Sequence, residues 1–390
     1  MSDHTADVIV VGGGVMGCAA AYHLAKDGQR VLLLEQFVVG HTHGSSHGPS
    51  RIIRLAYDGA DYVQLARAAY ALWHDLETES GESLLLKVGG FDFGSPNAFM
   101  LDGIRATYQA VGVPFEAVDR DEIVRRFPQF NLPEDTVGYY QPDYSLLAAD
   151  QCVATLAAQA RCHGATVYEN EPAREIRPTT SGVEVRTEQG TYTADRVILS
   201  AGSWLRPLLR QLDLELPLTV TKEQLAFYQP RDPTAFMPDR FPLFIHRFPG
   251  TTSLGSGFPL FGHAGVKMML DRIGPEVDPD DPDRAIDQPC LDRLRAYVAN
   301  ILPTLGDDII ETVTCRYTMT PDEHFIIDRH PTHPQMVIAS PCSGHGFKFG
   351  IVMGRILADL AVRGATEYNI ERFRLGRPAL KKHTGGDDLE

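Results

Sequence analysis

A glycine-rich turn between an apolar run and an alanine-rich segment constrains the fold of this chain more than any other feature. The run DVIVV at Asp7–Val11 leads into Gly12, Gly14 and Gly17, which have the spacing G-x-G-x-x-G. A continuous apolar run is typical of a strand buried on both faces. The alanine-rich segment after the turn predicts a helix, and the run RVLLLE at 30–35 predicts a second strand. These segments together form a β-α-β unit.

Glycines at these positions indicate a bound dinucleotide. They allow the backbone to turn tightly and to approach a pyrophosphate, which lies at the positive end of the helix dipole. Glu35, at the end of the second expected strand, can accept hydrogen bonds from ribose hydroxyls, and its charge disfavours the 2′-phosphate of NADP. A glycine turn that serves only helix–strand packing is the alternative. The flanking β-α-β pattern and Glu35 favour the dinucleotide.

The sequence after the β-α-β unit favours FAD over NAD. An NAD-binding domain would continue with alternating strands and helices, whereas a loop rich in Gly, His and Ser follows at 41–51. A later strand ends in VILSAGSW at Val197–Trp204, where Gly202 forms a second strand–glycine turn. Flavoprotein oxidases place such a turn against the cofactor, so we expect FAD.

The remaining segments mix helices with antiparallel strands, which predicts an α+β fold. Helices are expected at 62–79, 148–162, 291–302 and 346–362, strands at 87–94, 325–331 and 336–340, a hairpin-like meander at 165–202 and short antiparallel strands across 216–275. The expected architecture is an α/β Rossmann-like FAD-binding domain interleaved with a mostly antiparallel β-sheet substrate domain. We assign residues 1–85, 145–215 and 318–390 to the first domain, and 86–144 and 216–317 to the second.

Composition excludes several classes of protein. The 390 residues carry 36 Lys and Arg against 51 Asp and Glu, a net charge of −15, so we expect no nucleic-acid partner. No apolar run approaches the roughly 20 residues that span a bilayer. The N-terminal segment also lacks the positive charge of a signal peptide, so we expect a cytoplasmic protein with no membrane segment. The six cysteines form no C-x-x-C pair, and no metal site is expected.

Three further segments resemble one known family. They read HGPSRIIRLAY at His47–Tyr57, CRYTMTPDEHFIID at Cys315–Asp328 and SGHGFKFG at Ser343–Gly350. Together with the glycine turn, they make nearly the whole chain similar to the monomeric sarcosine oxidase and N-methyltryptophan oxidase family of glycine-oxidase-like, FAD-dependent amine oxidases. The resemblance implies a monomer that oxidises the amine of a secondary, N-methyl or cyclic amino acid to an imine and reduces O₂ to H₂O₂.

The resemblance also implies how the flavin is held. Cys315 matches the cysteine that this family attaches to the 8α-methyl carbon of the flavin, and such a thioether raises the flavin potential. By residue type alone, each cysteine would be a buried inert thiol. Cys342 is the one rival to Cys315 as the attachment residue, and we expect it to pack near the flavin ring. Gly344, His345 and Gly346 fall in the turn that passes the flavin, where their amides face its pyrimidine oxygens.

Four cationic residues match the catalytic positions of the family. Arg54 and Lys348 match the pair that receives the substrate carboxylate, for which a guanidinium gives a bidentate fork and an ammonium a point charge. Arg51 matches a residue that influences the electronics of the flavin ring. Lys267 matches the lysine that activates oxygen, although a surface lysine on an edge strand is the alternative. Tyr317 matches a tyrosine that lines the substrate cavity.

The chain departs from the sarcosine-oxidising members at three positions. Asp271 stands four residues after Lys267, where those members have histidine, Ser256 replaces a tyrosine and Ile245 replaces a methionine. These changes indicate a substrate larger or more basic than sarcosine. We expect Asp271 to contact the substrate amine or a second cationic group, the alternative being a carboxylate solvated at the cavity mouth.

Two other functions stay open at this point. One is a dehydrogenase of the same fold that passes electrons to a quinone or protein acceptor, and the other is a flavin-binding protein without turnover. The expected partners are a small amino acid substrate and O₂.

Overall fold

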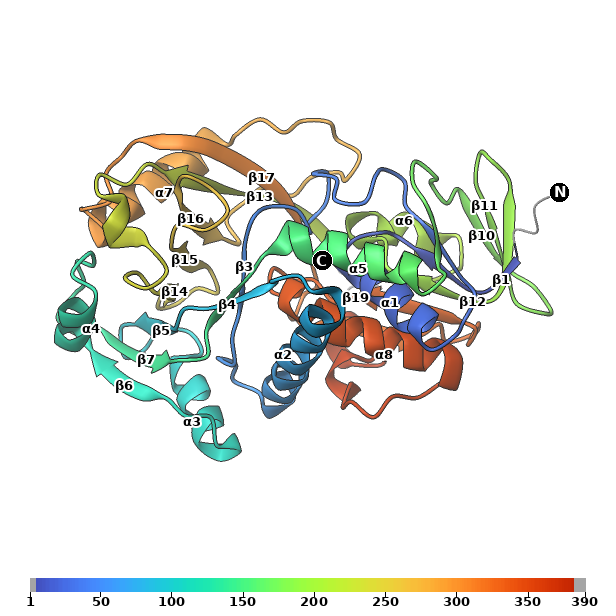
Figure 1. Cartoon of the computed structure of the whole chain (residues 1–390), viewed down its shortest axis with the longest axis horizontal. Helices are drawn as coiled ribbons and strands as arrows, with labels where there is room; N and C mark the ends of the chain where they lie inside the picture. Colours follow the sequence, from blue (N-terminus) through green and yellow to red (C-terminus); the bar gives the residue numbers. More distant parts are fainter. Residues whose placement is uncertain (1–4, 382–390) are drawn as a thin grey trace, which may run out of the picture.

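The computed structural model describes residues 5–381, so the ends of the predicted FAD-binding domain, 1–4 and 382–390, lie outside the described residues. Figure 1 shows two regions side by side, one built around β1 and the other around β13–β17. The strands form two eight-stranded sheets and a three-stranded sheet within the described part of the chain.

The first sheet contains the expected β-α-β unit. β1 (Thr5–Val11) pairs in parallel with β2 (Val31–Leu34) and with β12 (Thr191–Leu199), and α1 (Val15–Lys26) connects β1 to β2. The order is β10-β11-β12-β1-β2-β9, and β19 also pairs with β12 and with β18. The other strands are β9 (Thr166–Tyr168), β10 (Glu175–Pro178), β11 (Val183–Arg186), β18 (Ile326–Arg329) and β19 (Met336–Ser340).

Helices pack closely around α1 beside this sheet. α1 contacts α5 (Ala149–Cys162) and α8 (Gly350–Arg363), and α8 contacts α2 (Ala60–Ser80) (Figure 1). A Cβ atom at Gly354 of α8 would lie 2.4 Å from the backbone of Ala19, so glycine is what allows the two helices to approach. Their buried side chains form the largest apolar core of the described chain.

The second sheet is antiparallel except where β14 pairs with β5. Its order is β17-β13-β16-β15-β14-β5-β7-β6, and α7 (Gln288–Ile301) packs against β13 and β16. The strands are β5 (Gly90–Gly94), β6 (Glu116–Asp119), β7 (Val137–Gln141), β13 (Thr219–Tyr228), β14 (Leu243–Arg247), β15 (Leu254–Phe258), β16 (Val266–Asp271) and β17 (Ile309–Met319). The third sheet comprises β3 (Arg51–Ile53), β4 (Leu85–Lys87) and β8 (Ser145–Leu147).

The α+β fold is confirmed, and so are the helices expected at 62–79, 148–162 and 291–302. Short helices complete the described chain. They are α3 (Leu101–Val111), α4 (Arg120–Arg126), α6 (Leu205–Arg210) and α9 (Pro378–Lys381), with 3₁₀ turns η1 (Gly202–Trp204), η2 (Pro233–Phe236), η3 (Phe347–Phe349) and η4 (Glu371–Phe373). α3 and α4 have no counterpart among the expected elements.

Two expectations about strands are wrong. β10, β11 and β12 do form successive antiparallel pairs, but β9 pairs in parallel with β2 instead of opening the meander. The helix α5 before it returns the chain along the sheet, which is the crossover that parallel pairing needs. The run at 87–94 is not one strand, because Gly89 has φ +82° and separates β4 from β5, which belong to different sheets.

Candidate active site

A cavity of about 660 Å³ is lined by elements of both large sheets. Its lining begins at the glycine turn after β1 and at Glu35, continues past Cys315 and Lys267, and includes the turn at 341–348. The expected site residues therefore come from distant segments of the chain and meet around one space. Those that line it are Gly12, Gly14, Glu35, Arg51, Arg54, Gly202, Lys267, Asp271, Cys315, Tyr317, Gly344, His345, Gly346 and Lys348.

The glycine turn has no room for side chains. Gly12 has φ +101°, and a Cβ atom there would lie 2.7 Å from the carbonyl oxygen of Ser200. A Cβ atom at Gly17 would lie 1.8 Å from the carbonyl oxygen of Gly12. The backbone consequently borders the cavity directly at the start of α1, as a pyrophosphate site requires. Among the three motif glycines Gly12, Gly14 and Gly17, Gly17 alone lies outside the cavity lining.

Glu35 is held at the edge of this turn by backbone donors. Its carboxylate accepts the N–H of Gly13 at 2.6 Å and the N–H of Phe37 at 2.8 Å. Burial raises the pKa of Glu35 above its usual range, although the two N–H groups lower it. A ribose offers hydroxyl donors, which would compensate the buried carboxylate, so the residue fits a dinucleotide.

A second glycine turn borders the opposite part of the cavity. Gly344 has φ +76°, and a Cβ atom there would lie 2.6 Å from the ring of Tyr317. A Cβ atom at Gly346 would lie 1.7 Å from the carbonyl oxygen of Pro341. Glycine is therefore needed at both positions, and it brings the backbone close to Tyr317, whose hydroxyl donates to the sulfur of Met269 at 3.7 Å.

Cys315 lies on β17, opposite Glu223 of β13, and its side chain is buried. Burial raises the pKa of the Cys315 thiol to about 11, although Arg51 lowers it. Cys342 also lines the cavity, and burial raises its pKa to about 11 as well. Both cysteines therefore line the cavity in which the flavin is expected.

Lys267 is buried on β16, which lies between β13 and β15, so it is neither a surface lysine nor on an edge strand. Its ammonium donates to the carbonyl oxygen of Ser50 at 2.7 Å and lies 4.4 Å from the centre of the Phe258 ring. Burial, followed by the neighbouring Arg51 guanidinium, holds the pKa of Lys267 well below its usual range.

Arg51 is fixed by backbone acceptors. Its guanidinium donates to the carbonyl oxygens of Ser45 at 2.9 Å, His47 at 2.8 Å and Ser50 at 2.9 Å. Lys267 donates to the same Ser50 carbonyl, so the two cations share an acceptor beside the cavity. Lys267, on a strand of the second sheet, and Arg51, at the end of the loop at 41–51, therefore lie close together.

Lys348 and Arg54 form a second buried cationic pair. The Lys348 ammonium donates to the Tyr57 hydroxyl at 2.9 Å and to the carbonyl oxygen of His345 at 2.7 Å. Burial, followed by the Arg54 charge, holds the pKa of Lys348 well below its usual range. The Arg54 guanidinium lies 4.9 Å from the centre of the Tyr57 ring and donates to the Ala56 carbonyl.

The contacts of His345 determine its tautomer. Nε2 lies 3.1 Å from the carbonyl oxygen of Glu323, which can only accept, so Nε2 carries the proton. Burial and Lys348 hold the pKa of His345 well below its usual range, so the ring is neutral and Nδ1 is an acceptor. Tyr57 therefore donates to Nδ1 over 3.2 Å and accepts from Lys348.

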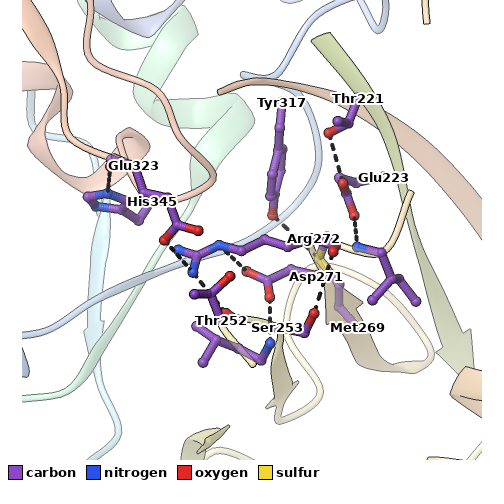
Figure 2. A network of polar contacts seen from close by, with 12 residues as sticks. Thr221, Glu223, Thr252, Ser253, Met269, Asp271, Arg272, Tyr317, Glu323 and His345 are labelled. Atoms are coloured by element: carbon purple, nitrogen blue, oxygen red, sulfur yellow. Dashed lines mark hydrogen bonds and ion pairs between the residues drawn. The ribbon is translucent and has the colours of Figure 1, made fainter. Parts of the chain in front are cut away.

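Asp271 is half-buried at the end of β16, with 14% of its side chain exposed, in a polar network with Arg272 and Glu323 (Figure 2). Its Oδ1 accepts the N–H of Leu254 at 2.8 Å, and its Oδ2 lies 3.9 Å from Arg272 Nε. Burial raises the pKa of Asp271 to about 6, although Arg272 and the Leu254 N–H lower it. Asp271 thus belongs to the cavity lining, as do Ser256 and Ile245.

Several residues of the site were given no role from the sequence. Tyr57 and Glu323 belong to segments that were singled out, whereas Arg272 became recognisable only through its contact with Glu323. Arg247 also lines the cavity, and it pairs with the fully buried Asp92 at 2.6 Å. An Arg and an Asp so far apart in the sequence give no local signal of pairing.

Two other sequence expectations concern membranes and metals. Within residues 5–381, no helix has the length and apolar character that a membrane crossing requires. The same residues contain no group of three or more His, Cys, Asp or Glu side chains placed to hold a metal ion.

Comparisons with known proteins point to one family. The family described as FAD dependent oxidoreductase (DAO) matches residues 7–360. The monomeric sarcosine oxidase of Bacillus sp. (strain B-0618) is 37% identical and is covered over 98% of each chain. The N-methyl-L-tryptophan oxidase of Salmonella arizonae is 30% identical, over 95% of this chain and 98% of the other. The solved structure of NikD, an unusual amino acid oxidase essential for nikkomycin biosynthesis, has a TM-score of 0.84 at 30% identity, covering 95% and 97% of the two chains.

Proposed function

This chain belongs to the FAD-dependent oxidoreductase (DAO) family, and we propose that it oxidises the amine of a secondary, N-methyl or cyclic amino acid. The substrate loses two electrons and two protons and becomes an imine, and O₂ takes up the same electrons and protons to become H₂O₂. The observation that carries the proposal is one cavity in which two cationic pairs accompany a dinucleotide turn, with only Arg51 of the four residues half-buried. Arg54 and Lys348 form one pair, and Arg51 and Lys267 the other.

FAD fits the residues that border the cavity. The turn at Gly12, Gly14 and Gly17 would hold the pyrophosphate, Glu35 the ribose, and the turns at Gly202 and 344–346 the flavin. When bound, FAD would supply the acceptor for a hydride equivalent from the substrate and the donor of two electrons to O₂. We propose that Cys315 binds it covalently, because this thiol lies in the cavity next to the Arg51 and Lys267 charges.

Arg54 and Lys348 would bind the substrate carboxylate. A guanidinium offers parallel donors for the two oxygens, and the ammonium adds a second positive charge. Both groups are buried, and a bound carboxylate would compensate the repulsion that lowers the pKa of Lys348. Tyr57 and His345 orient the ammonium through their hydrogen bonds.

Lys267 would assist the reaction with O₂. Its charge is fixed by the Ser50 carbonyl and the Phe258 ring, so it does not need to move when negative charge develops on oxygen. A preorganised cation in a buried site stabilises such charge more strongly than a solvated one. This feature favours an oxidase over a dehydrogenase that passes electrons to a quinone or protein.

Asp271 would accept the substrate amine or a second cationic group. Asp271 lines the cavity, and its Oδ2 receives no hydrogen bond within residues 5–381. Ser256, Ile245 and Tyr317 line the same cavity. A small serine at this position leaves room for a substrate larger than sarcosine.

The test is an amine panel with H₂O₂ detection, spanning sarcosine, other N-methyl amino acids, proline, pipecolate and basic amino acids. We expect peroxide with a larger N-substituted, cyclic or basic amino acid. Anaerobic reduction by that substrate followed by mixing with air separates the alternatives. Slow reoxidation without peroxide would favour the dehydrogenase, and failure of every amine to reduce the flavin would favour a protein without turnover.

We also propose the domain assignment made from the sequence. The first sheet draws its strands from 5–34, 166–199 and 326–340, and the second from 90–141 and 219–319, which supports that division. All six cysteines are free, which supports a reducing compartment such as the cytoplasm. A monomer is proposed on the resemblance to monomeric enzymes, and light scattering of the purified protein would test it.

A further inference from the structure

A turn after β16 and a turn before β18 meet through two charged residues with unusual backbones. Arg272 and Glu323 both have φ +59°, in the left-handed region that L residues avoid. Arg272 Nη1 lies 2.7 Å from Glu323 Oε2, and Figure 2 shows Asp271 on the other side of the guanidinium. A costly backbone conformation at both partners indicates that the surrounding fold fixes this contact.

Arg272 stands between two carboxylates but does not hydrogen-bond to Asp271. Its Nε lies 3.9 Å from Asp271 Oδ2 and is buried without a hydrogen-bond partner within residues 5–381. Its Nη1 also donates to the carbonyl oxygen of Thr252 at 2.8 Å. A movement of about 1 Å would bring Nε to the length of a charge-assisted hydrogen bond with Asp271.

We propose that Glu323 is a positioning residue, whose carboxylate holds the Arg272 guanidinium away from Asp271 and keeps Asp271 Oδ2 open to the substrate. The inference rests on the proposed function, in which Asp271 accepts the substrate amine or a second cationic group. Oδ1 already accepts the N–H of Leu254, so Oδ2 is the oxygen left for the cavity. If Arg272 closed onto Oδ2, a cationic substrate group would have to displace the guanidinium.

A second contact fixes Glu323 itself. Its carbonyl oxygen accepts the Nε2–H of His345 at 3.1 Å, as Figure 2 shows. His345 belongs to the turn that carries Lys348, whose ammonium donates to the His345 carbonyl. Glu323 therefore connects two parts of the cavity. Its carboxylate contacts Arg272 beside Asp271, and its backbone carbonyl contacts His345 in the turn that carries Lys348.

The pKa of Asp271 reports on the position of Arg272. The charged groups that act on Asp271 are Arg272 on the same turn, Glu223 on β13 and Glu323 on the turn before β18. Burial raises the pKa of Asp271 to about 6, Arg272 lowers it, and the two glutamates raise it. Closure of Arg272 onto Asp271 would lower this pKa further.

A double-mutant cycle on Glu323 and Arg272 tests the inference in the holoenzyme. The Asp271 midpoint is followed by NMR of isotope-labelled aspartate carboxyl carbons, with its signal assigned from Asp271→Asn. We expect Glu323→Gln to move the midpoint downward and to raise KM for the amine substrate roughly tenfold, with kcat little changed. In the Arg272→Ala background, Glu323→Gln should leave KM unaltered and shift the midpoint much less.

Asp328→Asn is the matched control, because Asp328 pairs with Arg374 at 2.7 Å outside the cavity lining and its loss should change neither value. If Glu323→Gln does not fold, Glu323→Asp takes its place in the test. This variant keeps the charge but withdraws it by one methylene, so both the midpoint and KM should change in the same direction by a smaller amount. An unmoved midpoint, or an equal KM effect in both backgrounds, would overturn the inference. The titration midpoint of Asp271 is measured without any turnover of substrate. If no amine in the panel is oxidised, the proposed function fails, but the effect of Glu323 on Arg272 and Asp271 can still be tested.

Discussion

The Tyr57 hydroxyl accepts a hydrogen bond from the Lys348 ammonium at 2.9 Å and donates to His345 Nδ1 at 3.2 Å. The donor and acceptor roles in this series of hydrogen bonds follow from its last member, because the Glu323 carbonyl oxygen can only accept and so requires a proton on His345 Nε2. Lys348 therefore donates to a hydroxyl oxygen whose own proton is donated to His345 Nδ1. Such a hydroxyl is a good acceptor, so it fixes the direction of the Lys348 side chain within the cavity wall.

Replacement of Tyr57 by phenylalanine should weaken substrate binding. The change removes one acceptor from Lys348 and leaves His345 Nδ1 without its donor, so the Lys348 side chain loses one of the two contacts that orient it. We expect KM for the amino acid to rise roughly tenfold, the value of one charge-assisted hydrogen bond, with a smaller change in kcat. Tyr62→Phe is the control, because Tyr62 stacks on Tyr57 but bonds to His324. Equal effects of the two substitutions would contradict a specific role for the Tyr57 hydroxyl.

Replacement of Lys267 by methionine should slow the reaction with O₂ and spare the reaction with the amine. Methionine keeps the apolar contact with Phe258 but removes the charge next to Arg51. We expect reoxidation of the reduced enzyme to slow by roughly 10²-fold, the usual effect of losing one preorganised electrostatic group. Anaerobic stopped-flow reduction provides the internal control. A variant that is reduced slowly but reoxidised normally would show that Lys267 acts on the amine instead.

Replacement of Cys315 by serine should release the flavin on denaturation. The parent protein is expected to stay yellow after acid precipitation, because a thioether survives unfolding, and Cys315→Ser should give a colourless pellet and a yellow supernatant. Cys342→Ser is the matched control, since Cys342 is a second thiol of the same cavity with a similarly raised pKa. If Cys342→Ser releases the flavin and Cys315→Ser does not, the attachment site is the other cysteine.

Much of the fold follows from local patterns in the sequence. β1, α1 and β2 were predictable because a buried parallel strand and a glycine turn each leave a continuous signal. The pairing of β9 was not, because its three residues fit a hairpin and a parallel edge equally well. Which pairing β9 adopts depends on where α5 ends relative to β2, and this position is determined by the packing of α5 against α1.

The site was predictable only in part, and for a different reason. The resemblance indicated that Arg54, Lys267 and Lys348 belong together, and all three line one cavity. Arg272 carries no such signal, and Glu323 was given no role although it lies in a segment that carries the resemblance, because the importance of both lies in a contact between two turns with unusual backbones. A charged residue that is isolated in the sequence is usually assigned to the surface, and the sequence does not show which other charged residue it contacts in the fold.

The raised pKa of Asp271 predicts opposite effects of pH on stability and on activity. Burial raises this pKa from 3.8 to about 6, so the folded protein binds the proton more tightly than the unfolded chain does. The contribution to stability is then complete below about pH 3.8 and is lost as the pH rises through about 6. Asp271→Asn, which cannot ionise, should therefore raise the free energy of unfolding by roughly 3 kcal/mol at neutral pH and by little below pH 4.

Activity should follow the opposite course, because the ionised Asp271 is the form that accepts a cationic group. We expect kcat/KM of the parent enzyme to rise as the pH increases through about 6, and Asp271→Asn to lose that rise while becoming more stable. Urea unfolding and steady-state kinetics across this pH range measure the two effects on the same proteins. A difference in stability between the two proteins that does not change with pH would show that the pKa of Asp271 is the same in the folded and unfolded protein, which would contradict the prediction.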